Sequence, residues 1–148
     1  MNFLKIILIF FFASLFLTNC AKKEKTSLIV EEDVESQMIR AFKEGYKEFE
    51  AGDNLYAAKK FNEAELLFPQ SSWAPKAALM AAYVYYAQDY YFDAEAELNR
   101  FIKTYPKSQD LAYAHFLLAM CYYEKIVDEK KDLGPLLRAQ EKFNFIIK

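Results

Sequence analysis

The sequence predicts an all-α protein built from repeated helical hairpins, and two observations support this. Hydrophobic residues make up 54% of the 148 residues. They recur at three- and four-residue spacing and do not alternate with polar residues, which favours helices over strands. A pattern of small and large side chains also returns after 37 positions, from Pro69 to Pro106. Such a period is typical of solenoids made of helix pairs.

Residues 1–19 are predicted to be a lipoprotein signal peptide. An apolar run of 12 residues begins at Ile6. A transmembrane helix needs about 20 apolar residues, so this run has the length of a signal-peptide core. Residues 17–20 read Leu-Thr-Asn-Cys and resemble a bacterial lipobox, which implies that Cys20 is lipidated and becomes the mature N-terminus. Asn19 stands where that motif usually has Gly, Ala or Ser, so a plain signal peptide or an uncleaved anchor is the alternative.

Residues 20–35 are expected to form the lipidated cysteine and a charged tether. Ala21 follows Cys20, and by similarity with known lipoproteins that neighbour permits sorting to the outer membrane. Four carboxylates lie between residues 31 and 35, but no His or partner carboxylate has ligand spacing. A solvated acidic tether is therefore favoured over a metal site.

Residues 36–148 are predicted to contain three helical hairpins, at about 36–69, 73–106 and 110–148, the last one incomplete. In the first hairpin, Gly52 suits the C-terminal end of a helix, and Asp53 or Asn54 is expected to cap the next helix.

In the second hairpin, Ser72 is expected to cap the first helix and Pro75 suits its first turn. Asp89 is expected to cap the second helix. Pro106 stops that helix, because the residue before a proline is disfavoured in the helical region.

The third hairpin begins near Ser108 or Asp110, and its first helix is expected to run to about Val127. A charged loop follows, which amounts to an insertion of about eight residues relative to the second hairpin. Solvation alone explains the loop, and a contact with a partner is the alternative. Pro135 suits the first turn of the last helix. Apolar residues near the end have no following repeat, which predicts that the chain is a fragment or that a partner covers this end.

The first two hairpins carry the same residue types in the same register. The equivalent positions are Gly45, Ala57, Phe61, Ala64 and Pro69 in the first, and Ala82, Ala94, Leu98, Phe101 and Pro106 in the second. Small residues let two helices approach closely, and the large residues fill the groove beside them. This register resembles the tetratricopeptide repeat, which implies that the hairpins stack into a short superhelical solenoid.

The sequence contains no constellation typical of catalysis, a cofactor or a metal ion. The single histidine, His115, lies among apolar residues of a predicted helix, where a packed or surface role is favoured over a ligand or base. Cys121 is expected to be an inert buried thiol. The glycines are isolated, which argues against a phosphate-binding loop. The net charge of −2 without a basic stripe argues against nucleic-acid binding.

Aromatic residues make up 18% of the chain and gather in the repeats. In the tetratricopeptide family the first helix of each pair lines the concave face. The facing positions transferred to this chain follow a 3, 4, 3 spacing that keeps each set on one helical face. They are Ile39, Phe42, Tyr46, Phe49, Lys76, Leu79, Tyr83, Tyr86, Tyr113, Phe116, Met120 and Tyr123. All but Lys76 are apolar or aromatic, which favours a peptide-binding groove over packing between helices alone.

A lipobox, a charged tether and the repeats together resemble the BamD family of outer-membrane assembly lipoproteins, also called ComL or YfiO. The most specific segments are Phe68-Pro69, Ser72-Trp73-Ala74, Ala82-Tyr83-Val84-Tyr85-Tyr86, Arg100-Phe101-Ile102, Tyr105-Pro106 and Ala112-Tyr113-Ala114. The family usually has five repeats, more than this chain holds.

The resemblance implies a non-enzymatic scaffold that is lipid-anchored in the outer membrane and faces the periplasm. Its partners would be subunits of the β-barrel assembly complex and unfolded barrel proteins, whose C-terminal signal ends in an aromatic residue. A periplasmic adapter for cell-wall synthesis or cell division is the alternative. The proteins that copurify with the chain would separate the two.

Overall fold

The computed structural model describes residues 32–126, 128 and 132–147, and within them every regular element is a helix. The predicted signal peptide, Cys20 and most of the predicted tether lie outside the described residues. The helices are α2 (Val34–Ala51), α3 (Asn54–Leu67), α4 (Ala74–Tyr86), α5 (Tyr91–Thr104), α6 (Leu111–Glu124) and α7 (Gly134–Ile147).

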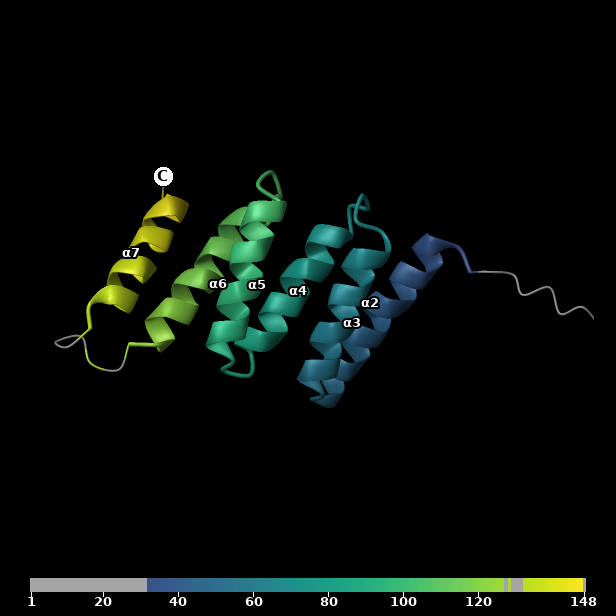
Figure 1. The fold of residues 1–148 in the computed structure, drawn as a ribbon, viewed down its shortest axis with the longest axis horizontal. Helices are drawn as coiled ribbons and strands as arrows, with labels where there is room; N and C mark the ends of the chain where they lie inside the picture. Colours follow the sequence, from purple (N-terminus) through teal and green to yellow (C-terminus); the bar gives the residue numbers. More distant parts are fainter. Residues whose placement is uncertain (1–31, 127, 129–131, 148) are drawn as a thin grey trace, which may run out of the picture. The chain divides into compact units, whose positions relative to one another are not determined.

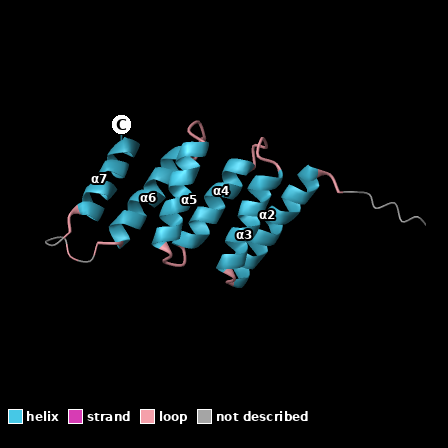
Figure 2. Ribbon diagram, in the orientation of Figure 1, coloured by secondary structure: helices cyan, strands magenta, loops and turns pink. Residues whose placement is uncertain are grey.

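Each helix packs against its neighbours along the chain, and α4 also contacts α6 (Figure 1). The pairs α2 and α3, α4 and α5, and α6 and α7 are consecutive helices that pack against each other as hairpins (Figure 2). The predicted all-α, tetratricopeptide-like repeat fold is therefore confirmed. Among the described residues, no helix combines the length and the apolar character that crossing a membrane requires.

Three capping residues set the helix ends of the first hairpin. Gly52 adopts a left-handed φ of 86° and ends α2, as predicted. The Asp53 carboxylate accepts a hydrogen bond from the backbone N–H of Tyr56 and caps α3. The start of α2 differs slightly from the sequence-based boundary. Asp33 caps it through the N–H of Ser36, so the helix begins at Val34, inside the segment assigned to the tether.

The two caps predicted in the second hairpin are wrong. Ser72 does not cap α4, because Trp73 occupies the cap position and already has helical backbone angles. The hydroxyl of Ser71 accepts a hydrogen bond from the N–H of Trp73. Asp89 does not cap α5 either. Its φ is 61°, and its carboxylate accepts a hydrogen bond from the Tyr91 hydroxyl at 2.6 Å. Tyr90 occupies the cap position without a side-chain hydrogen bond.

The prolines behave as predicted at three helix ends. Pro75 lies in the first turn of α4, and Pro135 is the second residue of α7. Helix α5 ends at Thr104, two residues before Pro106. Helix α6 ends at Glu124, three residues earlier than expected, because its C-terminal turn closes at Lys125 through hydrogen bonds to the preceding carbonyls.

The small residues of the repeat register set the distance between the helices of each hairpin. A Cβ atom added at Gly45 of α2 would lie 3.1 Å from the Phe61 ring and 3.2 Å from the Ala57 carbonyl oxygen of α3. No side chain larger than hydrogen therefore fits there without displacement. At the equivalent place in the second hairpin, Ala82 and Ala94 are both fully buried.

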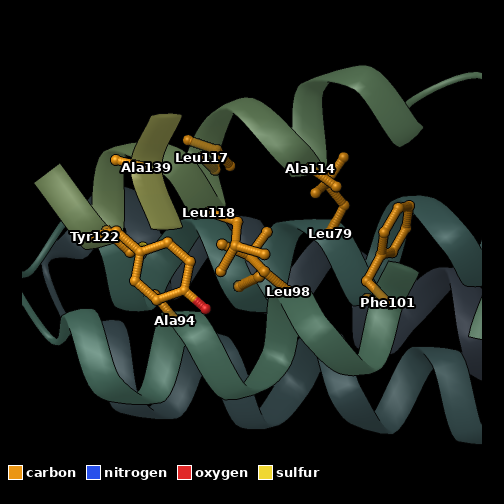
Figure 3. Close-up of a cluster of buried hydrophobic side chains, with 12 residues drawn as sticks. Leu79, Ala94, Leu98, Phe101, Ala114, Leu117, Leu118, Tyr122 and Ala139 are labelled. Carbon is orange, nitrogen blue, oxygen red and sulfur yellow. The ribbon is translucent and has the colours of Figure 1, made fainter. Parts of the chain in front are cut away.

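The largest buried cluster joins α4, α5, α6 and the first half of α7 (Figure 3). It is centred on Leu98 and Leu118, with Phe101 at one end and Tyr122 at the other. Helix α4 also contributes Ala77 and Ala81 to separate clusters with α2 and α3. Helix α4 is apolar almost all round, which allows it to pack against neighbours on two sides, as a central helix of a stack does.

A charged hydrogen-bond network links the second helices of the first two hairpins. Glu65 of α3 is only 5% exposed. Its two carboxylate oxygens accept hydrogen bonds from the Arg100 guanidinium of α5 at 2.8 and 2.7 Å, and the Tyr105 hydroxyl donates to the same carboxylate at 2.7 Å. The hydrogen bond to Glu65 raises the pKa of Arg100. The carboxylate is thus paired, as a buried charge requires.

Replacing Arg100 with leucine should lower the free energy of unfolding by about 2 kcal/mol, because Glu65 would stay buried without its counter-charge. Chemical denaturation of the Arg100→Leu protein measures this. Lys103→Leu, at an exposed position of the same helix, is the control and should change stability little. The double variant Glu65→Leu, Arg100→Leu should regain part of the loss. Equal losses for Arg100→Leu and Lys103→Leu would contradict the role of the network.

His115 and Cys121 are both buried on α6, as the sequence predicts for packed side chains. The His115 ring lies 3.9 Å from the Phe145 ring of α7, measured between centroids, and its Nδ1 has no hydrogen-bond partner among the described residues. Burial, assisted by Lys142, lowers the pKa of His115, while Glu141 opposes this shift. Burial raises the pKa of the Cys121 thiol to about 12, so the thiol is protonated at neutral pH.

The stability of the protein should fall as the pH decreases from about 7 to 5, through the ordinary histidine pKa. The folded state has the lower His115 pKa, so the unfolded state binds a proton more readily in this range. The contribution should stay below about 1.4 kcal/mol per pH unit. Urea unfolding at each pH measures it. His115→Phe should remove this part of the pH dependence, and an unchanged slope in that variant would refute the assignment.

Candidate functional site

The first helices of the three hairpins bring side chains from the predicted facing positions around one cavity. This cavity, called here the aromatic pocket, has a volume of about 410 Å³. Its lining residues are Phe42 from α2; Lys76, Leu79, Met80 and Tyr83 from α4; Asp110, which precedes α6; and Tyr113 from α6. Five of the twelve facing positions therefore meet in one place.

Two rings that line the aromatic pocket, Phe42 and Tyr83, pack against other rings nearby. Phe42 makes edge contacts with the Phe61 ring at 5.2 Å and with the Trp73 ring at 5.3 Å, centroid to centroid. Phe49 of α2 makes an edge contact with Tyr83 of α4 at 5.9 Å. These edge-to-face arrangements are favourable for aromatic pairs. Phe42 and Tyr83 thus take part in ring packing and line the cavity at once.

The other predicted groove residues divide into packed and exposed side chains. Tyr86 is half-buried and contacts Tyr91, and Met120 is also half-buried. Tyr46 and Tyr123 are about half exposed, at 49% and 55%. Phe116 is exposed too, but its ring stacks on Tyr113 at 6.2 Å. Peptide binding by these residues stays a prediction.

Burial raises the pKa of both Tyr86 and Tyr113. Glu124 adds to the shift of Tyr86, and Tyr83 adds to that of Tyr113. Both phenols are therefore neutral at physiological pH and retain a hydroxyl that donates a hydrogen bond. A wall of this kind offers an apolar ring face and a polar tip.

The sequence reading missed three residues around the pocket: Trp73, Met80 and Asp110. A signal for two of them existed, because extending the row of facing positions by three residues toward the N-terminus reaches 36, 73 and 110. A larger hollow of about 650 Å³ lies elsewhere, along α3 beside Tyr85. It gathers few ring faces, so the aromatic pocket is the better candidate for binding an aromatic side chain. Among the described residues, no group of His, Cys, Asp and Glu is arranged to hold a metal ion.

Replacing Phe42 with alanine should lower the free energy of unfolding by about 2 kcal/mol, because the ring packs on Phe61 and Trp73. Tyr123→Ala should change it by less than about 0.5 kcal/mol, because that side chain is largely exposed. Thermal unfolding of the two variants compares them directly. A loss at Tyr123 as large as that at Phe42 would mean that the exposed end of the row is also structural.

Comparison with known proteins identifies the repeat region. The family model described as "YfiO: Outer membrane lipoprotein" matches residues 34–148. The outer membrane protein assembly factor BamD of Caulobacter vibrioides is 33% identical over 113 residues, which cover 76% of this chain and 36% of that protein. The factor of the same name from Rickettsia prowazekii is 28% identical over 133 residues, covering 90% of this chain and 51% of that protein. The chain thus spans between about a third and a half of these relatives.

Proposed function

The chain belongs to the YfiO family of outer membrane lipoproteins, and we propose that it acts as a non-enzymatic scaffold in the assembly of β-barrel proteins into the outer membrane. Two relatives that carry the name of an outer membrane protein assembly factor support this role. The chain spans at most about half of either relative. We therefore propose, on the basis of this similarity, that the chain shares the activity and the partners of the whole relatives.

The proposed location is the periplasmic face of the outer membrane, with the chain held by a lipid on Cys20. The support is the lipobox-like sequence before Cys20 and the family description. A single acyl chain gives only marginal membrane binding, whereas several chains give a durable anchor. In that arrangement the repeat domain needs no contact of its own with the bilayer, because the tether carries the attachment.

We further propose that the aromatic pocket receives the C-terminal signal of an unfolded barrel protein, which ends in an aromatic residue. The observation that supports this most is the convergence of three helices on one concave site walled by Phe42, Leu79, Tyr83 and Tyr113. Its volume of about 410 Å³ falls within the range of small-ligand sites. A ring entering the site would meet both apolar surface and phenol hydroxyls.

Replacing both Tyr83 and Tyr86 with alanine should weaken binding of a short peptide ending in phenylalanine at least tenfold, because the variant loses two rings of the proposed groove. Fluorescence anisotropy with a labelled peptide and the whole chain in detergent measures the affinity. Circular dichroism shows whether the variant stays folded.

A matched control removes two tyrosines outside the proposed groove, in the variant Tyr56→Ala, Tyr90→Ala. Both side chains are exposed, at the start of α3 and just before α5. This control should bind the peptide as the unmodified chain does. An unchanged affinity in a folded Tyr83→Ala, Tyr86→Ala protein would refute the groove.

A further inference from the structure

The aromatic pocket carries two opposite charges among its apolar lining. Lys76 belongs to α4, and Asp110 lies directly before α6. Lys76 is also the one charged residue among the twelve facing positions. A charge placed beside an apolar cavity contributes orientation and specificity rather than burial of area. The two side chains therefore bear on what kind of ligand the pocket accepts.

The ammonium group of Lys76 lies over an aromatic ring and has no carboxylate paired with it among the described residues. Its Nζ lies 4.9 Å from the centre of the Trp73 ring, which favours a cation over the ring face. Within the described part of the chain, no carboxylate lies within 4.0 Å of it. Lys76 is the third residue of α4, at the positive end of that helix dipole. The ring positions the ammonium group, and the unpaired charge and the helix dipole both favour an anion from a ligand at this position.

Asp110 favours one orientation of a ligand in the pocket. Its carboxylate makes no capping hydrogen bond to α6, so it is available at the cavity wall. It repels a ligand anion and accepts hydrogen bonds from a ligand N–H. A peptide with a free C-terminus has this polarity, since its last carboxylate is an anion and its backbone carries N–H donors. The carboxylate therefore belongs on the α4 side of the pocket.

We infer that Lys76 binds the terminal carboxylate of a peptide whose last, aromatic side chain enters the aromatic pocket. This inference rests on the proposed function of that pocket and adds the chemical group that is read there. The pocket would then distinguish the end of a chain from an internal aromatic segment, because only the end supplies a carboxylate beside the ring.

The test compares one short peptide ending in phenylalanine in two forms, the free acid and the C-terminal amide. The whole chain in detergent should bind the free acid about tenfold more tightly than the amide. Lys76→Met should bind both forms alike, with an affinity near that of the amide for the unmodified chain. Lys103→Met, an exposed lysine of α5 outside the pocket, is the matched control and should keep the tenfold preference.

The outcomes separate this inference from the function on which it rests. Equal binding of acid and amide by the unmodified chain would overturn the carboxylate contact and leave the aromatic pocket as a site for internal segments. A preference that survives in Lys76→Met would move the contact to another residue and overturn the inference. Failure of both peptides to bind would overturn the inference and the peptide-binding function together. Loss of the preference at high salt would agree with a charge contact.

Discussion

The close approach of the two helices within each hairpin is the constraint on which the rest of this structure depends. In the first hairpin the hydrogen of Gly45 faces the Phe61 ring, and a Cβ there would lie 3.1 Å from that ring. In the second hairpin two alanines, Ala82 and Ala94, take the corresponding places and are fully buried. At this spacing the second helices cover one side of the first helices. The aromatic residues on the other side of the first helices line the aromatic pocket.

Successive repeats are joined by charged pairs and by contacts between aromatic rings. Between second helices, the buried carboxylate of Glu65 reaches across to Arg100. Between a second helix and the next first helix, Glu95 of α5 contacts Lys125 and accepts a hydrogen bond from Tyr122 at the end of α6. Between the first helices α2 and α4, the rings of Phe49 and Tyr83 make an edge contact. Charged pairs are directional and fix the register of the repeats, whereas rings leave an open apolar surface that a ligand is able to share.

Sequence reasoning predicted the helical fold and most helix ends because these depend on local chemistry. Gly52 needed a left-handed conformation, and Pro106 prevented further helix. The capping roles assigned to Ser72 and Asp89 were wrong, because short polar side chains have several nearby partners and the turn geometry decides among them. The facing rows came from the resemblance to the tetratricopeptide repeat, but the place of the pocket among them did not follow from it. Asp110 reaches the pocket from outside any helix, and the packing of α4 against α6 brings it to the same cavity as Lys76.

The rings of the aromatic pocket pack against neighbouring residues as well as lining the proposed binding site, and this limits which substitutions the site tolerates. Phe42 supports Trp73, and Trp73 in turn lies under the ammonium of Lys76. A change in either ring therefore alters the spacing of α2 and α4 together with any ligand contact. Lys76 itself is exposed and joins no buried cluster, so its charge is free to change while the walls stay in place. Under the proposed function, the charged residues of the aromatic pocket would set its selectivity, and its rings would maintain its shape.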